Sequence, residues 1–220
     1  MRRFAALSAA ALAFAAAPVS AQNLLSTGSF EDPALAPGTT FTTIMNGGTI
    51  GAWSVTAGSV DLIRSYWAPA DGFQSLDLNG SSFGSIAQTV GTSNGGRYTL
   101  TFAMGGNTDS QADKVMRVWW GSQDLGVFTF AQAGNTRTNM NYRTVTLAGL
   151  IAGSASTTLR FEGAGTTPFN GVALDNVNIT QDIVPEPSML LLMATGMLGA
   201  LGIVARRRRS LAAAIARTDA

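Results

Sequence analysis

Apolar and polar residues alternate in short runs through the middle of this chain, and this period of two predicts β-strands. Residues 98–104, read YTLTFAM, place a large apolar side chain at every second position, and residues 157–162, read TTLRFE, follow the same pattern. Both runs predict half-buried strands whose larger side chains face a core. Further strands are predicted at 52–56, 59–64, 74–78, 85–90, 115–120, 126–130 and 142–147.

Glycine and asparagine separate these runs, as at residues 46–48, 79–80 and 94–96, and such clusters mark turns. No segment before residue 188 keeps an apolar period of 3.6 over three turns, so helices are not expected there. Many short strands joined by turns are typical of two packed antiparallel sheets. We therefore predict an all-β domain over residues 22–182, a two-sheet antiparallel sandwich of jelly-roll type.

The last predicted strand, from Gly171 to Thr180, contains a change of parity. The apolar residues at 172 and 174 share one face of a regular strand, whereas those at 177 and 179 share the other. A β-bulge at Asp175-Asn176 would turn all four toward the core and hold Asp175 at an interruption of the strand. A second carboxylate, Glu31, follows the first apolar segment and converges with Asp175 if the first and last strands are neighbours.

Both ends of the chain carry targeting signals. Residues 1–21 predict a secretory signal peptide cleaved after Ala21, since two arginines, an apolar stretch and a small-residue site follow one another. The alternative, an N-terminal membrane anchor, usually has a longer apolar run. Near the other end, 188–205 is uncharged and long enough for a helix of ~27 Å, which predicts a transmembrane helix.

Four arginines follow this apolar run, at Arg206, Arg207, Arg208 and Arg209. Because guanidinium groups are costly to move through hydrocarbon, we expect them to remain cytoplasmic, with residues 210–220 as a cytoplasmic tail. The domain that precedes the helix would then lie outside the inner membrane.

Composition argues against several classes of function. Residues 22–182 hold 11 acidic and 7 basic side chains, a net charge of about −4, so nucleic acid is not an expected partner. Cysteine and histidine are absent from the chain. Stability must therefore come from the core and from any bound cation, and the commonest general base is missing. We do not expect an enzyme.

Some polar and aromatic residues are candidates for a sugar-binding surface, because sugars are held by a flat ring and by charged groups that bond hydroxyls. The candidates are Asp61, Arg64, Tyr66, Trp67, Asp77, Asn79 and Trp119. Asp61 and Asp77 point away from the core if their strands are regular. Trp119 and Trp120 cannot both face inward. The alternative is that the aspartates satisfy loop backbone groups and that the aromatic rings cover the core.

A series of motifs along the domain resembles the choice-of-anchor C family, related to the DUF642 group. Seven motifs occur in order: GSFE at 28–31, GAWSV at 51–55, GSVDLI at 58–63, SLDLNG at 75–80, GSIAQT at 84–89, YTLTF at 98–102 and ALDNV at 173–177. The resemblance implies a galactose-binding-like β-sandwich, an architecture shared with many carbohydrate-binding modules. It also implies a structural Ca²⁺ held by Glu31 and Asp175. The residues alone leave open that both carboxylates instead bond backbone N–H groups.

The C-terminal segment 183–209 resembles the PEP-CTERM sorting signal of Gram-negative bacterial exoproteins. Pro185, Glu186 and Pro187 precede the apolar run, and the arginine cluster closes it. The resemblance implies processing by an exosortase-type transpeptidase and a transient stay in the inner membrane.

Taken together, these features predict an exported protein of the cell surface or extracellular matrix that binds exopolysaccharide or another glycan. The alternatives are a structural biofilm-matrix protein without specific sugar binding and, more remotely, a glycan-active enzyme.

Overall fold

The computed structural model of this protein describes residues 22–182 and 187–216, in two compact units divided at Asp182. The predicted signal peptide, Pro185 and Glu186 lie outside the described residues. The first unit is the strand-rich domain that the sequence predicts.

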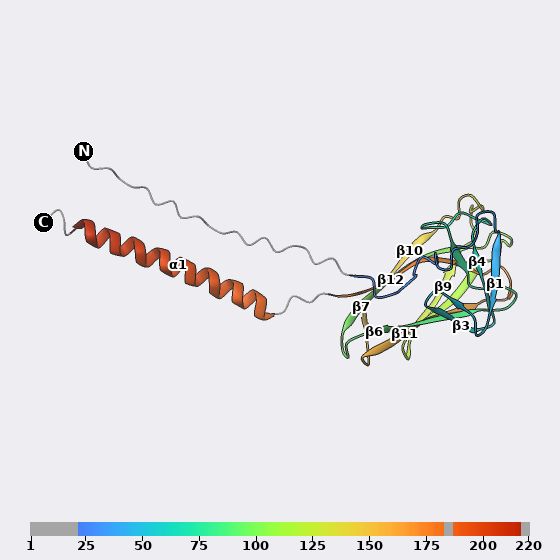
Figure 1. Cartoon of the computed structure of the whole chain (residues 1–220), viewed down its shortest axis with the longest axis horizontal. Helices are drawn as coiled ribbons and strands as arrows, with labels where there is room; N and C mark the ends of the chain where they lie inside the picture. Colours follow the sequence, from blue (N-terminus) through green and yellow to red (C-terminus); the bar gives the residue numbers. More distant parts are fainter. Residues whose placement is uncertain (1–21, 183–186, 217–220) are drawn as a thin grey trace. The chain divides into compact units, whose positions relative to one another are not determined.

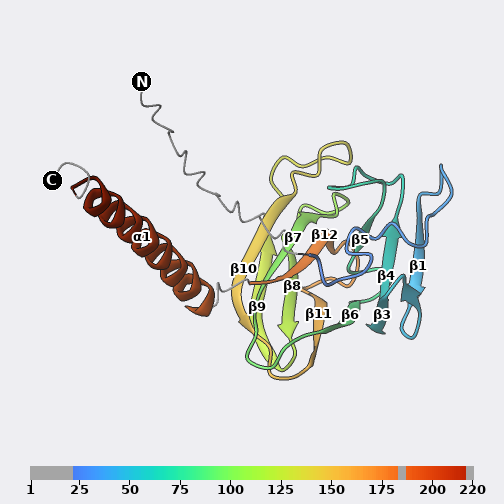
Figure 2. The same ribbon diagram turned by 60° about the vertical axis from the view of Figure 1, so that its left-hand side comes forward.

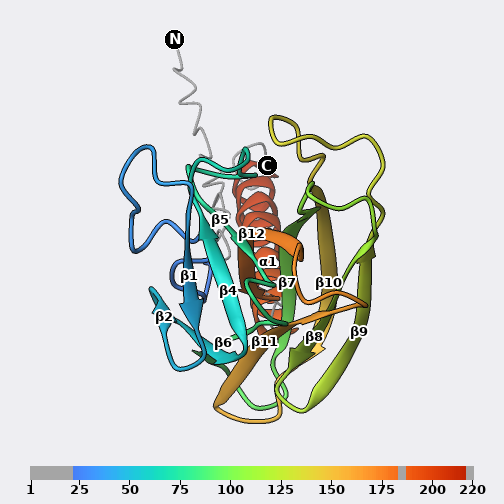
Figure 3. The ribbon, with the colours of Figure 1, turned by 90° about the vertical axis from the view of Figure 1, so that its right-hand side faces the viewer.

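Within residues 22–182 the strands form two six-stranded antiparallel sheets packed face to face (Figures 1 and 3). The first sheet has the order β1 (Phe41–Met45), β4 (Ser59–Ile63), β5 (Ser75–Asp77), β12 (Val172–Gln181), β7 (Arg97–Gly106) and β10 (Arg143–Ile151). The second has the order β2 (Thr49–Ile50), β3 (Trp53–Ala57), β6 (Ser85–Gly91), β11 (Ser156–Ala164), β8 (Lys114–Trp120) and β9 (Gln123–Phe130). The all-β sandwich is thus confirmed.

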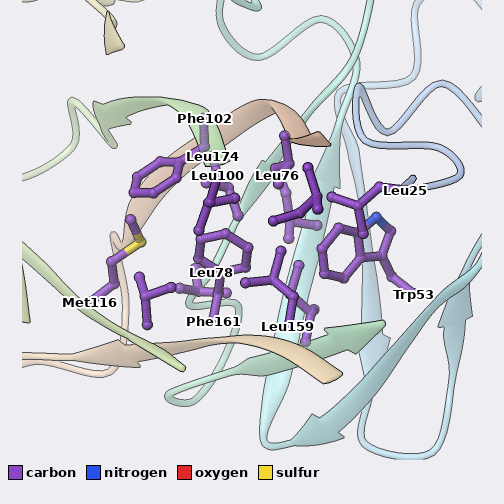
Figure 4. Packing of buried hydrophobic residues seen from close by; sticks show 14 of the residues in the cluster. Leu25, Trp53, Leu76, Leu78, Leu100, Phe102, Met116, Leu159, Phe161 and Leu174 are labelled. Carbon is purple, nitrogen blue, oxygen red and sulfur yellow. The ribbon is translucent and has the colours of Figure 1, made fainter. Parts of the chain in front are cut away.

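The core lies between the two sheets, and Figure 4 shows how their inner faces interlock. Leu76, Leu100 and Leu174 come from the first sheet, and Trp53 and Phe161 meet them from the second. All five side chains have 0% exposure. Each such burial stabilises the fold by about 1.5–3 kcal/mol before entropy is counted. A core of this size fits a domain that has no disulfide.

Two strands, β1 and β2, escaped prediction: β2 has only two residues, and β1 is mostly exposed. β1 forms an edge of the first sheet, and four of its five side chains are exposed. An edge strand without an inward row of apolar residues carries no alternation for sequence analysis to detect. Its backbone is nevertheless paired along its length with β4, as Figure 2 shows.

The predicted bulge in β12 is present. The pairing of β12 with β7 shifts between Asp175 and Asn178, and Asn176 has a positive φ of 47°, which asparagine tolerates better than most residues. The residues on both sides of the bulge, among them Leu174 and Val177, are buried in the core. Asp175, which follows Leu174 in the strand, lies on the opposite face of the first sheet, and the bulge after it returns Val177 to the core.

Loops cover that outer face of the first sheet around β4, β5 and β12. Beneath them lies a second, smaller apolar cluster of Ile63, Trp67, Met140 and Ala173, which brings together strands β4 and β12 and the segments 64–74 and 131–142. Polar side chains that alternate with the core residues are consequently buried too, as Asp77 (2% exposed) and Asp175 (0% exposed) show. In this region, therefore, the outer face of the first sheet is buried, as its inner face is.

The second unit contains the helix α1, Pro187–Ala216. The transmembrane helix predicted at 188–205 begins in residues whose side chains lie outside the described part of the chain. Among the residues that are described, no helix combines the length and the apolar character needed to cross a bilayer. The predicted transmembrane helix is therefore not shown by the structure.

Candidate ligand-binding groove

The segment 64–74 joins β4 to β5, and we call it the β4–β5 loop. Two carboxylates hold it from different sides. Glu31 Oε1 accepts hydrogen bonds from the backbone N–H groups of Phe73 and Gln74, each at 2.7 Å. Asp175 Oδ2 accepts from the N–H groups of Ala70 at 2.8 Å and Asp71 at 2.9 Å. Both carboxylates therefore bind the same loop, Asp175 at residues 70–71 and Glu31 at residues 73–74.

Further contacts fix the ends of the same loop. The Gln74 side chain, fully buried, donates from Nε2 to the carbonyl oxygens of Phe30 at 2.5 Å and Pro33 at 3.1 Å. Trp67 Nε1 donates to Ser75 Oγ at 2.8 Å. An irregular loop with this many hydrogen bonds to the rest of the domain has little freedom to rearrange, so the surface that it presents is preorganised.

A hollow of about 570 Å³ opens along this loop, and we call it the aromatic groove. It is lined by Pro37, Gly38, Arg64, Ser65, Tyr66, Trp67, Ala68, Pro69, Gly72, Phe73, Arg137 and Thr138. Its walls thus come from three segments far apart in sequence, and the β4–β5 loop supplies most of them.

Two ring-and-guanidinium pairs stand in the groove. The Phe73 ring is 66% exposed, and the Arg64 guanidinium carbon lies 4.7 Å from its centroid. The Arg137 guanidinium carbon lies 3.9 Å from the centroid of Tyr66. Stacked guanidinium groups of this kind keep their N–H edges available while their faces rest on a ring.

The Tyr66 hydroxyl and Arg137 are engaged with Asp109. Tyr66 donates to Asp109 Oδ2 at 2.5 Å, and Arg137 Nη2 donates to Asp109 Oδ1 at 2.6 Å and to the Tyr66 oxygen at 2.5 Å. The hydrogen bond to Asp109, followed by burial, raises the pKa of Tyr66 above its ordinary value. Arg137 therefore already has an anionic partner within the protein.

A smaller hollow of about 160 Å³, which we call the acidic pocket, shares Tyr66 and Trp67 with the aromatic groove. Asp61 and Asp77 face it from directly opposed positions on β4 and β5. Burial raises the pKa of Asp77 to about 7, although Asn107, Asn79 and Gly171 donate hydrogen bonds to its carboxylate. Burial also raises the pKa of Asp61.

Glycine is required at position 171 for this arrangement. A Cβ atom there would lie 2.6 Å from Asp77 Oδ1, so only glycine lets its N–H reach that oxygen. The hydrogen bonds of Asp77 agree with the predicted alternative, in which this carboxylate satisfies backbone groups of loops.

The structure brings most of the candidate residues together. Asp61, Asp77 and Asn79 line the acidic pocket, Arg64 lines the aromatic groove, and Trp67 lines both. Trp67, however, is only 4% exposed and packs in the smaller apolar cluster, so its ring is not open for stacking.

Trp119 lies elsewhere. It is on β8 in the second sheet, donates from Nε1 to Glu162 Oε2 at 2.7 Å, and lies between the guanidinium groups of Arg117 and Arg160. It lines neither the groove nor the acidic pocket. Trp120 is the buried member of the pair.

Phe73 and Arg137 were missed by sequence analysis. Phe73 directly follows the turn-rich stretch Ala70-Asp71-Gly72, which has no apolar pattern of a buried strand. A large aromatic residue in such a stretch indicates an exposed ring, and sequence analysis could have used that signal. Arg137 has no local signal, because only the packing of 131–142 against the β4–β5 loop brings it there.

The pattern Gly-x-Ser-x-Gly at 80–84, typical of some hydrolases, also went unrecognised. In the structure these residues form the turn between β5 and β6, and Ser82 Oγ lies 3.3 Å from Ser59 Oγ. The chain has no histidine that could activate such a serine. This turn is not the strand-to-helix elbow on which that chemistry depends.

In this arrangement the carboxylates of Glu31 and Asp175 bind the backbone of the loop: both oxygens of Asp175 and one oxygen of Glu31 accept backbone N–H groups. Within residues 22–182 and 187–216, moreover, no three acidic, histidine or cysteine side chains gather as a metal site. A bound Ca²⁺ stays a prediction.

The fold and the groove define a two-sheet β-sandwich domain with a preorganised surface built by its loops. The chain belongs to the DUF642 family, described as a protein of unknown function, whose sequence pattern matches residues 23–180. A PEP-CTERM protein-sorting motif matches residues 184–209. Both predicted resemblances are thereby confirmed, while the narrower choice-of-anchor C assignment stays a prediction.

Halomucin from Haloquadratum walsbyi is a relative of this chain. The two are 36% identical over 176 residues, which make up 76% of this chain. The matched part is 2% of halomucin, so the chain spans a small fraction of that relative's length.

Solved structures with a similar fold include carbohydrate-binding modules. TmCBM61 in complex with β-1,4-galactotriose has 12% identity and a TM-score of 0.47, and the match covers 73% of this chain and 99% of that one. The CBM22-1 xylan-binding domain of Xyn10C from Paenibacillus barcinonensis has 14% identity and a TM-score of 0.46, with 75% and 97% covered. What these modules bind is a property of those proteins.

Proposed function

We propose that this protein is an exported, non-catalytic glycan-binding protein and that the aromatic groove is its binding site. The observation that carries the proposal is the exposed Phe73 ring, which stands in a 570 Å³ hollow beside Arg64 on a loop fixed by Glu31 and Asp175. A pyranose ring has an apolar face that packs on an aromatic ring, and its hydroxyls bond to charged donors. The groove offers both.

Replacing Phe73 by alanine is expected to weaken glycan binding about tenfold, because the ring that packs on the sugar is removed. The melting temperature should change little, since the Phe73 side chain is 66% exposed. Affinity electrophoresis and calorimetry with neutral and acidic polysaccharides measure the effect.

Trp119→Ala is the matched control, since it removes a larger aromatic ring outside the groove. Its binding should equal that of the unaltered protein. Equal losses in both variants would contradict the assignment of the site. If no polysaccharide is retained, including the exopolysaccharide of the source organism, the protein is a structural matrix component instead. Turnover of a glycan would point to an enzyme.

We also propose that an exosortase-type transpeptidase processes the tail during a transient association with the inner membrane, after which the domain reaches the cell surface or matrix of a Gram-negative bacterium. The sorting motif at 184–209 supports this proposal. Intact mass spectrometry of the mature protein is expected to show a chain that starts at Gln22 and has lost α1. A mature chain that still contains Arg206 to Arg209 would contradict it.

A further inference from the structure

Among the residues that the structure describes, Arg64 has no anionic partner. Its guanidinium lies 4.7 Å from the Phe73 ring centroid, and none of the ion pairs within residues 22–182 includes it. Arg137, the other arginine of the groove, is already paired with Asp109 at 2.6 Å. An arginine that is held by a ring and left unpaired offers its N–H edges to an incoming group.

The charge of the groove differs from that of the domain around it. Acidic residues outnumber basic ones in 22–182, yet the residues that line the aromatic groove include two arginines and no carboxylate. Of the carboxylates near the groove, Glu31 and Asp175 accept N–H groups of the loop backbone, and Asp109 is paired with an arginine. Asp71 is exposed on the same loop. The lining of the groove is therefore more positive than the domain around it, which favours an anion there.

We infer that the groove selects acidic glycans, with an anionic sugar substituent bound by Arg64 beside the Phe73 ring. The inference rests on the proposed glycan-binding function and names its substrate class. A carboxylate of a uronic acid and a sulfate ester share the required chemistry, since both accept two parallel N–H bonds from a guanidinium fork. A neutral glycan offers the fork only hydroxyl oxygens, which are weaker acceptors than an anion.

Two matched pairs of polysaccharides test this inference. One pair is polymannuronate and its carboxyl-reduced form, and the other is dextran sulfate and dextran. In at least one pair, the unaltered protein is expected to bind the acidic member at least tenfold more tightly than the neutral member. This difference in affinity should decrease at high salt, because salt screens the charge of Arg64. Arg64→Gln should abolish that preference by weakening the binding of the acidic members far more than that of the neutral members, and Arg64→Lys should restore part of it.

Arg97→Gln is the control, because it removes the same charge from an exposed position at the start of β7, outside the groove. Melting curves verify that every variant folds. A preference that survives Arg64→Gln, or that Arg97→Gln lowers equally, would overturn the inference, as would equal binding of acidic and neutral members. In those cases glycan binding itself would stand. Failure to bind either pair, or any other glycan, would remove both the inference and the proposed function.

Discussion

Replacing Asp175 by asparagine is expected to lower the free energy of unfolding by about 2–4 kcal/mol and to abolish most glycan binding. The carboxylate is fully buried and accepts three backbone N–H groups, those of Ala70, Asp71 and Asn176. An amide has one oxygen where the carboxylate has two, so at least one buried N–H loses its acceptor and faces another donor. Such a loss costs about 1–3 kcal/mol for each buried group.

Binding should fall with stability because the same hydrogen bonds shape the groove. Asp175 holds the loop at 70–71, next to Gly72 and Phe73 in the groove wall. Urea unfolding and calorimetric titration of the variant measure the two effects. Asp71→Asn is the matched control, since Asp71 is an exposed aspartate on the same loop, and its stability should stay within about 0.5 kcal/mol of the unaltered protein.

A calcium chelator distinguishes the two roles considered for Asp175. If the carboxylate binds the loop backbone, the chelator leaves the melting temperature of the unaltered protein unchanged. If it holds Ca²⁺ with Glu31, the chelator lowers the melting temperature, because loss of a ligand of the native state destabilises it. A chelator-sensitive protein, together with an Asp175→Asn variant of normal stability in its presence, would refute the role in the loop.

Stability is expected to decrease by several kcal/mol as the pH rises from about 4.5 to 7.5. Burial raises the pKa of Asp77 from 3.8 to about 7. Burial acts in the same direction on the pKa of Asp175, but three backbone N–H groups favour its ionised form, so the prediction rests on Asp77. Between these values the folded protein retains protons that the unfolded chain releases, so a rise in pH favours unfolding. Each unit of difference in pKa corresponds to about 1.4 kcal/mol. Urea unfolding at several pH values measures the slope.

Asp77→Asn should flatten this slope, because it removes the group that titrates. The charged groups near Asp77 are Asp61, whose negative charge adds to the shift, and Lys114, whose own pKa is lowered by burial. Asp124→Asn is the control, because hydrogen bonding to Arg117 lowers the pKa of Asp124 and places its titration below this range. Stability that rises between pH 4.5 and 7.5 would contradict the prediction.

Strands with an inward row of apolar residues were predictable, and so was the bulge of β12. In both cases the signal is a relation between residues two positions apart, and the pleat of a strand turns that relation into a shared face. The edge strand β1 was missed because its exposed residues lack this relation. By the same rule, sequence analysis correctly predicted that the side chains of Asp61 and Asp77 point away from the core.

The alternation of apolar and polar residues did not predict which loops cover the outer face of the first sheet. Sequence analysis expected Asp77, Trp67 and Arg64 to share one open surface, whereas loops bury Asp77 and Trp67 and leave Arg64 at the groove. The loops take their positions from long-range contacts, such as the packing of Trp67 with Met140, and from hydrogen bonds to Glu31 and Asp175. Neither kind of contact leaves a periodic pattern.

By itself, therefore, the sequence determined the β-sandwich, the place of the bulge and the sorting motif, because each depends on residues that are close together along the chain. Only the tertiary structure decided that Phe73 is the exposed ring, that Arg137 is paired and Arg64 is not, and that Trp119 lies on the other sheet. These properties depend on which loops fold over which face, and that is settled by packing and hydrogen bonds between distant segments.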